Sequence, residues 1–401
     1  MNPQPRYIKI GVSVAAWSIV ISAATYQSHT PVVFGRYSWG YIIWLGLLIG
    51  VALTLSLVDS TRYQTLYRLR TALLMSVISL FLTLGVVELG IRLVDPLGIS
   101  YYERIGTYSR DKLPDNQLVF RHKPSWETRY GNVLVTYNER GLRDRPILPK
   151  VPNEYRVLAL GDSVTFGWGV DQDKTFAARL ESLLPSRLHR PVRVINSGVG
   201  GYNTVQEVTY FKQDGIALQP DLVLLTYVQN DIDELNPAWN PWAAHSSGEK
   251  SIGERFNRMV GQLWLYRLVH HTYNYGLPKV KAEPATTSLQ EGTGWRQSMA
   301  ALRELVALCE QHHIPLMVFF ERVNPNDNSV LLHDVLLNAH GVPVQDMAAW
   351  FMGLDESVIE NSKVDRHHNA EGHRVMAEHM ANDIVAYWAM RSSTTTMARH
   401  K

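Results

Sequence analysis

Three long uncharged apolar runs near the amino terminus constrain the fold of this chain more than any other feature. They cover residues 10–26, 40–58 and 71–87. At about 1.5 Å per residue of helix, 19 residues span roughly 28 Å, close to the thickness of the hydrocarbon core of a bilayer. Three such runs in succession, separated by short polar loops, are not expected of core helices in a soluble protein. We therefore predict three transmembrane helices that make residues 1–95 a membrane anchor.

Basic residues in the flanking loops predict the orientation of these helices. The loops on one side carry five basic residues, whereas the loop between the first two runs carries only Arg36. Because basic loops stay in the cytoplasm, we predict a multi-pass protein of the inner (cytoplasmic) membrane whose residues after 95 face the periplasm or exterior. A signal peptide cleaved near Ser22 is an alternative for the first run and leaves those residues on the same side. The five basic residues are Arg6, Lys9, Arg62, Arg68 and Arg70.

Composition excludes several classes of function. The net charge is +2, and no basic stripe with interleaved aromatic residues is present, so we expect no nucleic-acid partner. No pair of histidines comes with carboxylates or cysteines at a zinc-like spacing, so neither a metal nor another cofactor is expected. The single cysteine, Cys309, excludes an internal disulfide. The lipid bilayer is the partner that the apolar runs indicate.

Beyond the anchor, the sequence divides into a polar segment and an α/β domain. Residues 96–153 are rich in Tyr, Arg and Pro, and we interpret them as a connecting subdomain rather than a core. Over residues 154–390 strand patterns alternate with helix patterns, which predicts a parallel sheet flanked by helices in a three-layer, flavodoxin-like arrangement. Strands are expected at 156–160, 192–195, 222–228, 315–320 and 342–344, and helices at 175–188, 204–214, 297–311, 329–339 and 370–389.

Two segments depart from that alternation. Residues 236–294 form an insertion with many aromatic residues. These aromatics could line an acyl or sugar pocket as a lid, lie against the bilayer, or form the core of a small helical subdomain. The tail, residues 391–401, has no apolar pattern and is expected to be disordered. The aromatic residues of the insertion include Trp239, Trp242, Phe256, Trp264, Tyr266, Tyr273 and Tyr275.

Polar segments follow three of the predicted strands and open the last helix. They cover residues 161–163, 196–201, 229–231 and 365–369. In a parallel sheet, reactive groups collect beyond the carboxyl ends of the strands, so we expect these segments to meet. Together they supply a hydroxyl, flexible backbone donors, a side-chain amide and a carboxylate beside imidazoles. Serine-based acyl transfer needs these groups.

The same four segments resemble the conserved blocks of the GDSL/SGNH hydrolases, in the order of that family and over roughly residues 154–390. A lone Gly-Asp-Ser marks many ordinary turns, whereas four blocks in order are specific. The resemblance implies an SGNH-hydrolase-like fold. The blocks are Gly161-Asp-Ser-Val-Thr-Phe-Gly-Trp-Gly169, Asn196-x-Gly198-x-x-Gly201, Gln229-Asn230-Asp231 and Asp365-x-His367-x-Asn369.

The resemblance also implies a role for individual residues. Ser163 corresponds to the nucleophile, His367 to the base that takes its proton, and Asp365 to the acid that orients the imidazole. The backbone N–H groups of Ser163 and Gly201 and the side-chain amide of Asn230 correspond to the oxyanion hole.

The last block departs from the commonest family pattern, Asp-x-x-His-Pro-Asn. Counting three residues from Asp365 selects His368 as the base, whereas counting back two residues from Asn369 selects His367. Residues two apart in an extended loop face the same side, so Asp365 can still orient the ring of His367. We favour His367 and keep His368 as the alternative.

The implied activity is hydrolysis or transfer of an ester-linked acyl group, with acetyl the leading candidate, on an extracytoplasmic glycan or lipid. A lipase or lysophospholipase is one alternative, favoured by the nearby membrane and the aromatic insertion. A catalytically inactive glycan-binding module of a surface assembly complex is another. The intact set of Ser163, Asp365 and His367 argues against an inactive module.

Overall fold

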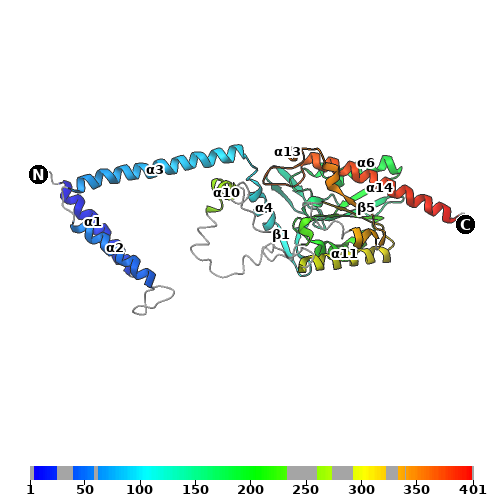
Figure 1. Ribbon diagram of the computed structural model, residues 1–401, viewed down its shortest axis with the longest axis horizontal. Helices are drawn as coiled ribbons and strands as arrows, with labels where there is room; N and C mark the ends of the chain where they lie inside the picture. The colour runs from blue at the N-terminus through cyan, green and yellow to red at the C-terminus, as the bar shows by residue number, and fades with distance from the viewer. Residues whose placement is uncertain are drawn as a thin grey trace. The chain divides into compact units, whose positions relative to one another are not determined.

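The chain divides into two compact units, Met1–Gly90 and Ile91–Lys401 (Figure 1). The structure is a computed structural model that describes residues 4–24, 39–57, 62–232, 260–272, 292–321, 333–338 and 340–399.

The amino-terminal unit contains the helices expected from the apolar runs. Helices α1 and α2 lie side by side (Figure 1). Trp17 Nε1 donates to Ser56 Oγ at 3.2 Å, and Tyr41 Oη donates to the Ala23 carbonyl at 2.7 Å, so polar contacts join the two helices. The helices are α1 (Gln4–Ala24), α2 (Trp39–Leu57) and α3 (Arg62–Val94).

One segment in the described part of the chain, Ala72–Val94 of α3, is long and apolar enough to cross a membrane. Lys9–Ala24 and Tyr41–Leu57 are shorter apolar helices. The ends of the first two predicted runs, residues 25–26 and 58, lie outside the described residues. An anchor with three spans therefore stays a prediction.

The carboxy-terminal unit is built on a five-stranded sheet with strand order β6-β5-β7-β8-β9, in which every neighbouring pair is parallel. The register pairs Val157 with both Val194 and Leu222, so β5 lies between β6 and β7. This confirms the predicted parallel sheet. The strands are β5 (Tyr155–Gly161), β6 (Val192–Asn196), β7 (Leu222–Tyr227), β8 (Leu316–Phe320) and β9 (Val344–Asp346), the last starting two residues later than expected.

Helices cover both faces of the sheet because alternate strand residues point to opposite sides. Val157 and Ala159 of β5 pack in the core beneath α6 (Phe176–Leu188) and α14 (Ala370–Arg399). Leu158 and Leu160 pack in the core beneath α7 (Thr204–Tyr210) and α11 (Thr293–Gln311). Figure 1 shows α6 and α14 on one side of the sheet and α11 on the other. The three-layer α/β fold is thus as predicted.

The segment 96–153 is more than the connector that we expected. It forms helix α4 and two antiparallel hairpins, and its tyrosines Tyr108, Tyr130 and Tyr137 are buried with Phe166 and Trp168 in one cluster. Tyrosine can be buried because its hydroxyl finds partners, and here Tyr130 Oη bonds Tyr137 Oη at 3.0 Å. The elements are α4 (Tyr101–Arg110), β1 (Lys112–Asp115), β2 (Val119–His122), β3 (Glu127–Tyr130) and β4 (Val133–Thr136).

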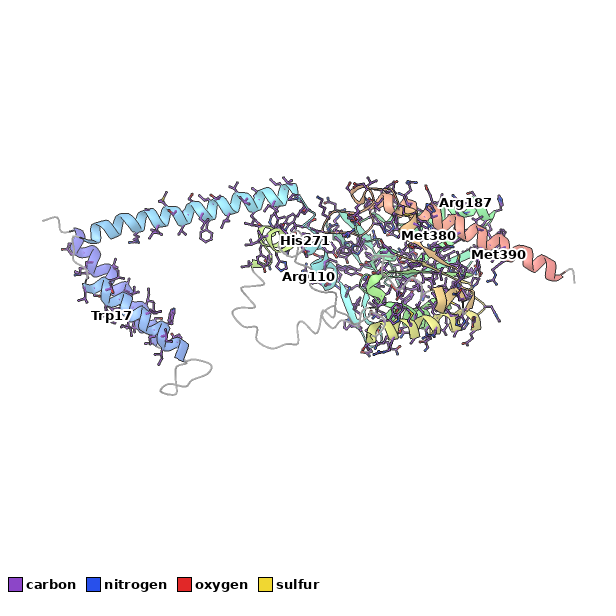
Figure 2. The ribbon with its side chains drawn as sticks, in the orientation of Figure 1. Trp17, Arg110, Arg187, His271, Met380 and Met390 are labelled. Atoms are coloured by element: carbon purple, nitrogen blue, oxygen red, sulfur yellow. The ribbon has the colours of Figure 1, made fainter. Side chains whose placement is uncertain are left out.

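The tail also differs from expectation. Helix α14 does not end near residue 389 but continues to Arg399, so residues 391–399 are helical rather than disordered. No Gly or Pro interrupts the sequence between Gly372 and Arg399, so nothing in the chain stops the helix. Met380 is fully buried against the sheet, whereas Met390 is 58% exposed, so the last turns extend beyond the core (Figure 2).

Most of the insertion 236–294 lies outside the described residues. The part that is described includes helix α10 (Trp264–His271). Trp264 Nε1 donates to Glu103 Oε1 at 2.7 Å, which ties α10 to α4. The predicted helix 329–339 is described only in part, as a helical turn at His333–Asn338. Whether the insertion acts as a lid, a bilayer contact or a separate core stays open.

Candidate active site

Ser163 stands at the carboxyl end of strand β5, which lies between β6 and β7, where the chain turns directly into the short helix α5 (Ser163–Phe166). Asp162 caps this helix, because its Oδ1 accepts from the Val164 backbone N–H at 2.9 Å. Gly161 adopts a φ of +150°, and a Cβ there would lie 2.4 Å from Thr226 Oγ1. The glycine of the first block is therefore required for this sharp strand-to-helix turn.

A continuous chain of hydrogen-bond contacts joins Ser163, His367 and Asp365. His367 Nε2 lies 2.8 Å from Ser163 Oγ, and His367 Nδ1 lies 2.7 Å from Asp365 Oδ1. The Asp365 side chain is fully buried and that of His367 is 21% exposed. A buried carboxylate that holds one imidazole nitrogen leaves the other nitrogen aimed at the hydroxyl, which is the geometry that serine activation needs.

The loop before α14 is fixed by its own backbone, so the Asp-x-His spacing suffices. The Asn361 N–H donates to the His367 carbonyl at 2.9 Å, and the Ser362 N–H donates to the Asp365 carbonyl at 2.9 Å. Asn369, the last residue of the block, donates through Nδ2 to the Val358 carbonyl at 2.9 Å. These bonds fold the loop so that the carboxylate and the ring, two residues apart, meet.

His368 has different neighbours. It is 4% exposed, its Nε2 lies 3.2 Å from Glu321 Oε1, and its ring stacks on Phe351 at 4.5 Å. Burial opposes its charged form, but the hydrogen bond and charge of Glu321 raise the pKa of His368 above its usual value. The geometry therefore favours His367 over His368 as the base. His373 on α14 accepts from the Phe176 N–H of α6 at 3.2 Å, so it packs between these two helices.

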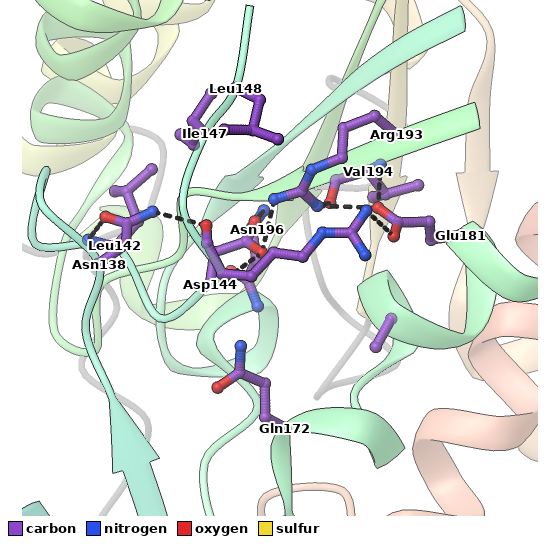
Figure 3. Close-up of polar contacts among 12 residues, drawn as sticks. Asn138, Leu142, Asp144, Ile147, Leu148, Gln172, Glu181, Arg193, Val194 and Asn196 are labelled. Carbon is purple, nitrogen blue, oxygen red and sulfur yellow. Dashed lines mark hydrogen bonds and ion pairs between the residues drawn. The ribbon is translucent and has the colours of Figure 1, made fainter. Parts of the chain in front are cut away.

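The second block is anchored by a buried polar network (Figure 3). Asp144 accepts from the Asn196 backbone N–H at 2.9 Å and from Arg193 Nη2 at 2.7 Å. Asn196 in turn donates through Nδ2 to the Thr165 carbonyl at 2.8 Å, and its Oδ1 accepts from the Gly198 N–H at 2.9 Å. The network ties the loop after β6 to the helix that follows Ser163.

Asn230 links the third block to the other two. Its Nδ2 donates to Asp162 Oδ2 at 3.1 Å and reaches the Tyr202 carbonyl at 3.5 Å. The Val199 N–H donates to the Gly161 carbonyl at 3.1 Å. The structure therefore brings together the strand ends that carry the predicted oxyanion donors of Ser163, Gly201 and Asn230.

Asp162 also touches the nucleophile. Ser163 Oγ lies 2.9 Å from Asp162 Oδ2, in addition to its contact with His367. A hydroxyl has one proton, so Ser163 can donate to the carboxylate or to the imidazole but not to both. Asp162 is therefore both the cap of α5 and a second acceptor beside the nucleophile.

A buried acidic pair lies behind the third block. Glu207 on α7 is 2% exposed, and burial, followed by the charges of Asp231 and Asp162, raises its pKa well above 4.5. Asp231 Oδ2 accepts from the Val228 N–H at 2.5 Å. The raised pKa favours the neutral form of Glu207, which reduces the negative charge beside the loop that carries Asn230.

Sequence reasoning missed the residues that helix α4 adds to the site. Arg104 Nη2 lies 3.4 Å from Asp365 Oδ2, so a cation balances the buried carboxylate. The ring of Tyr101 lies 6.2 Å from the ring of His367, and burial raises the pKa of Tyr101 to about 12. Both residues belong to segment 96–153, whose Tyr- and Arg-rich composition was the only signal of their presence.

Within the described residues no cluster of three or more His, Cys, Asp or Glu side chains is arranged to hold a metal ion.

Comparison with known proteins identifies the family of this chain. The GDSL-like Lipase/Acylhydrolase family model matches residues 159–375. Similar solved structures include a putative lipolytic protein of the G-D-S-L family from Desulfitobacterium hafniense DCB-2 (15% identity, TM-score 0.34, covering 57% of this chain and 98% of that chain). Another is an acetylxylan esterase from Geobacillus stearothermophilus (16% identity, TM-score 0.37, covering 59% of this chain and 96% of that chain). A third is a two-domain esterase active on acetylated mannans (15% identity, TM-score 0.35, covering 58% of this chain and 50% of that chain). None of the curated protein sequences matches the chain. The chain belongs to the GDSL-like lipase/acylhydrolase family, whose members are ester-cleaving hydrolases.

Proposed function

We propose that this protein is a membrane-anchored serine esterase or acyltransferase that acts on ester-linked acetyl groups of an extracytoplasmic glycan or lipid. The observation that carries the proposal is the chain of contacts from Asp365 through His367 to Ser163, in a member of an acylhydrolase family. An inactive binding module would have no need to keep all three groups in contact.

The geometry supports a two-step acyl transfer. His367 Nε2 takes the proton of Ser163 as Oγ bonds to the ester carbonyl carbon, and Asp365 stabilises the imidazolium that forms. The negative oxygen of the tetrahedral intermediate accepts from the N–H groups of Ser163 and Gly201 and from Asn230 Nδ2. His367 then gives its proton to the alcohol oxygen as the C–O bond breaks, which leaves an acyl-serine.

The second step returns the enzyme to its starting state. Water or a sugar hydroxyl donates its proton to His367 and attacks the acyl carbon, and the bond to Ser163 Oγ breaks as the imidazolium returns a proton to it. Water as the acceptor gives hydrolysis, and a sugar hydroxyl gives acyl transfer.

The test is the Ser163→Ala variant beside the parent protein. We expect turnover of 4-nitrophenyl acetate and labelling by a fluorophosphonate to disappear, because triad removals in serine hydrolases cost on the order of 10⁶ in kcat. Ser182→Ala is the matched control, because Ser182 is an exposed serine on α6 whose hydroxyl bonds only the helix backbone. Full activity of Ser163→Ala would refute the mechanism.

A lipase is the second candidate, and the apolar segment Ala72–Val94, which precedes the hydrolase domain in the sequence, favours it. Acyl chain length separates the two candidates. An acetylesterase should lose kcat/KM as the acyl chain of a 4-nitrophenyl ester grows from two to twelve carbons, whereas a lipase should gain. A panel of acetylated glycans offered to the purified protein then tests the glycan substrate.

The location rests on Ala72–Val94 and on the excess of basic residues in the proposed inner loops. An alkaline phosphatase fused after Lys401 should be active if the hydrolase domain lies outside the cytoplasm. A reporter that folds only in the cytoplasm should be inactive at the same position, and the reverse pattern would refute this topology.

A further inference from the structure

The carbonyl of Gly200, in the second block, is held by side chains from the segment that precedes the family match. Lys112 Nζ on β1 donates to the Gly200 oxygen at 2.9 Å, and Tyr108 Oη on α4 lies 3.2 Å from the same oxygen. A Cβ at Gly200 would lie 2.9 Å from Tyr108 Oη, so only glycine allows this close approach.

Lys112 is an unusual residue for this place. It is 2% exposed, and its Nζ lies 3.6 Å from the ring centroid of Phe120 and 4.4 Å from that of Tyr108. Burial lowers the pKa of Lys112 well below its usual value. An apolar side chain of similar size would avoid the cost of burying an amine, so the core alone gives no reason for a lysine here.

Counting protons identifies Lys112 as the donor to Gly200. Tyr108 Oη also lies 2.7 Å from His122 Nε2, and His122 Nδ1 lies 3.2 Å from the Gly141 carbonyl. Burial first, then the charge of Lys112, lowers the pKa of His122 to about 3, so the ring is neutral and has one N–H. That N–H must be on Nδ1 to donate to Gly141, so Nε2 accepts the single proton of Tyr108. Of the two side chains near the Gly200 oxygen, Lys112 is then the one that donates a hydrogen bond to it.

The direction of this carbonyl decides where the next N–H points. The structure contains no cis peptide bond among its described residues, so the C=O of Gly200 and the N–H of Gly201 point in opposite directions across one rigid plane. A peptide between two glycines turns over easily, and Gly201 already has a φ of +84°. A donor fixed to the Gly200 oxygen opposes that rotation, and it also polarises the amide so that its N–H is a stronger donor.

We infer that Lys112 is a positioning residue for the oxyanion hole: it holds the Gly200–Gly201 peptide so that the Gly201 N–H faces the reacting carbonyl. The inference rests on the proposed function, because it gives Gly201 the role of an oxyanion donor. It makes segment 96–153 part of the catalytic apparatus, although the family match begins only at residue 159.

The test compares an oxygen ester with its thionoester, in which the carbonyl oxygen is replaced by sulfur. Sulfur accepts hydrogen bonds weakly, so the ratio of the two turnover rates reports on the oxyanion donors. Lys112→Met should lower kcat for 4-nitrophenyl acetate by a factor of about 10–10³, with KM nearly unchanged. The upper figure corresponds to the complete loss of one oxyanion donor. The thionoester rate should change by less than about threefold, so the ratio of the oxygen-ester rate to the thionoester rate should fall by at least about threefold.

Three further variants make the result specific. Lys123→Met is the matched lysine control, because Lys123 is partly exposed in the same segment over the ring of Trp126, and its ratio should equal that of the parent. Tyr108→Phe should also keep the parental ratio, because the proton of Tyr108 is directed at His122. Lys112→Gln keeps a hydrogen-bond donor on a shorter side chain, so its ratio of oxygen-ester to thionoester rate should fall less than that of Lys112→Met. It provides the test if Lys112→Met does not fold.

The outcomes separate the inference from the function on which it rests. Loss of turnover in Ser163→Ala, together with an unchanged ratio in every folded Lys112 variant, would overturn the inference and leave the serine mechanism standing. A fall in the ratio for Tyr108→Phe, with no fall for the Lys112 variants, would show that Tyr108 and not Lys112 positions the Gly200–Gly201 peptide, and this too would overturn the inference. Turnover that survives in Ser163→Ala would remove the basis of both.

Discussion

Replacing His367 or His368 by glutamine should separate catalysis from stability at two adjacent positions. His367 contacts Ser163 and Asp365, whereas His368 pairs with Glu321 in a buried position against Phe351. Glutamine keeps a polar side chain of similar reach at both positions but cannot carry a proton near neutral pH. The same change therefore removes a base at one position and a charge pair at the other.

For His367→Gln we expect a loss of about 10⁴–10⁶ in kcat, because glutamine cannot take the proton of Ser163 and pass it to the leaving alcohol. Stability should change little. Arg104 stays 3.4 Å from Asp365 Oδ2 and still balances the buried carboxylate. The midpoint of thermal unfolding should therefore stay within about 2 °C of the parent, which corresponds to less than about 1 kcal/mol for a domain of this size.

For His368→Gln we expect the opposite pattern. A charge-assisted hydrogen bond, such as that between a protonated His368 and Glu321, contributes about 1.5–3 kcal/mol to stability, whereas one from a neutral glutamine contributes about 0.5–1.5 kcal/mol. The expected loss of stability is the difference, about 1–1.5 kcal/mol. The Glu321 side chain is 26% exposed, so water weakens the pair and the lower figure applies. The midpoint should fall by about 2–4 °C, while kcat on an acetyl ester stays within about tenfold.

The pH dependence of that destabilisation follows from the sign of the shift. The folded-state pKa of His368 is raised, so its contribution is fully present below its usual value of 6.5 and is lost as the pH rises through the raised pKa. The difference in melting temperature between parent and His368→Gln should therefore be larger at pH 6 than at pH 9. Differential scanning fluorimetry and 4-nitrophenyl acetate turnover on the same preparations provide both readouts. An inactive His368→Gln beside an active His367→Gln would show that the base has been assigned to the wrong histidine.

Two other predictions test the surroundings of the site. Asn230→Ala should lower kcat by about 10²–10³ with little change in KM, because one oxyanion donor is lost, and a loss below about fivefold in steady-state kinetics would contradict that role. Glu207→Gln should stabilise the protein increasingly as the pH rises above about 4.5, because a carboxyl whose folded pKa is raised costs stability above its unfolded pKa. Thermal unfolding measured at several pH values above 4.5 is the test, with the exposed Glu127→Gln as control; parallel curves for Glu207→Gln and the parent would refute the shift.

The sequence by itself determined the sheet, the helices around it and the central groups of the site. Each of these has a local signal: a continuous apolar run in β5, helical periodicity in α14, and short polar blocks that follow a strand at Ser163 and open the last helix at His367. The carboxyl ends of parallel strands share one edge of a sheet, so the blocks had to meet there. The choice between His367 and His368 was harder, because the spacing in the last block allowed both.

Only the tertiary structure decided which residues surround that centre. Arg104 beside Asp365, Lys112 on Gly200 and Glu321 beside His368 pair residues that are far apart in the chain, and no periodicity connects them. Segment 96–153 has a polar composition, yet its tyrosines are buried because their hydroxyls bond one another and nearby polar groups. A hydropathy pattern reports how readily each side chain leaves water for an apolar environment. It does not report which side chains contact one another in the folded protein. These contacts exist only once the chain has folded, so the residues that surround the catalytic groups can be identified only from the tertiary structure.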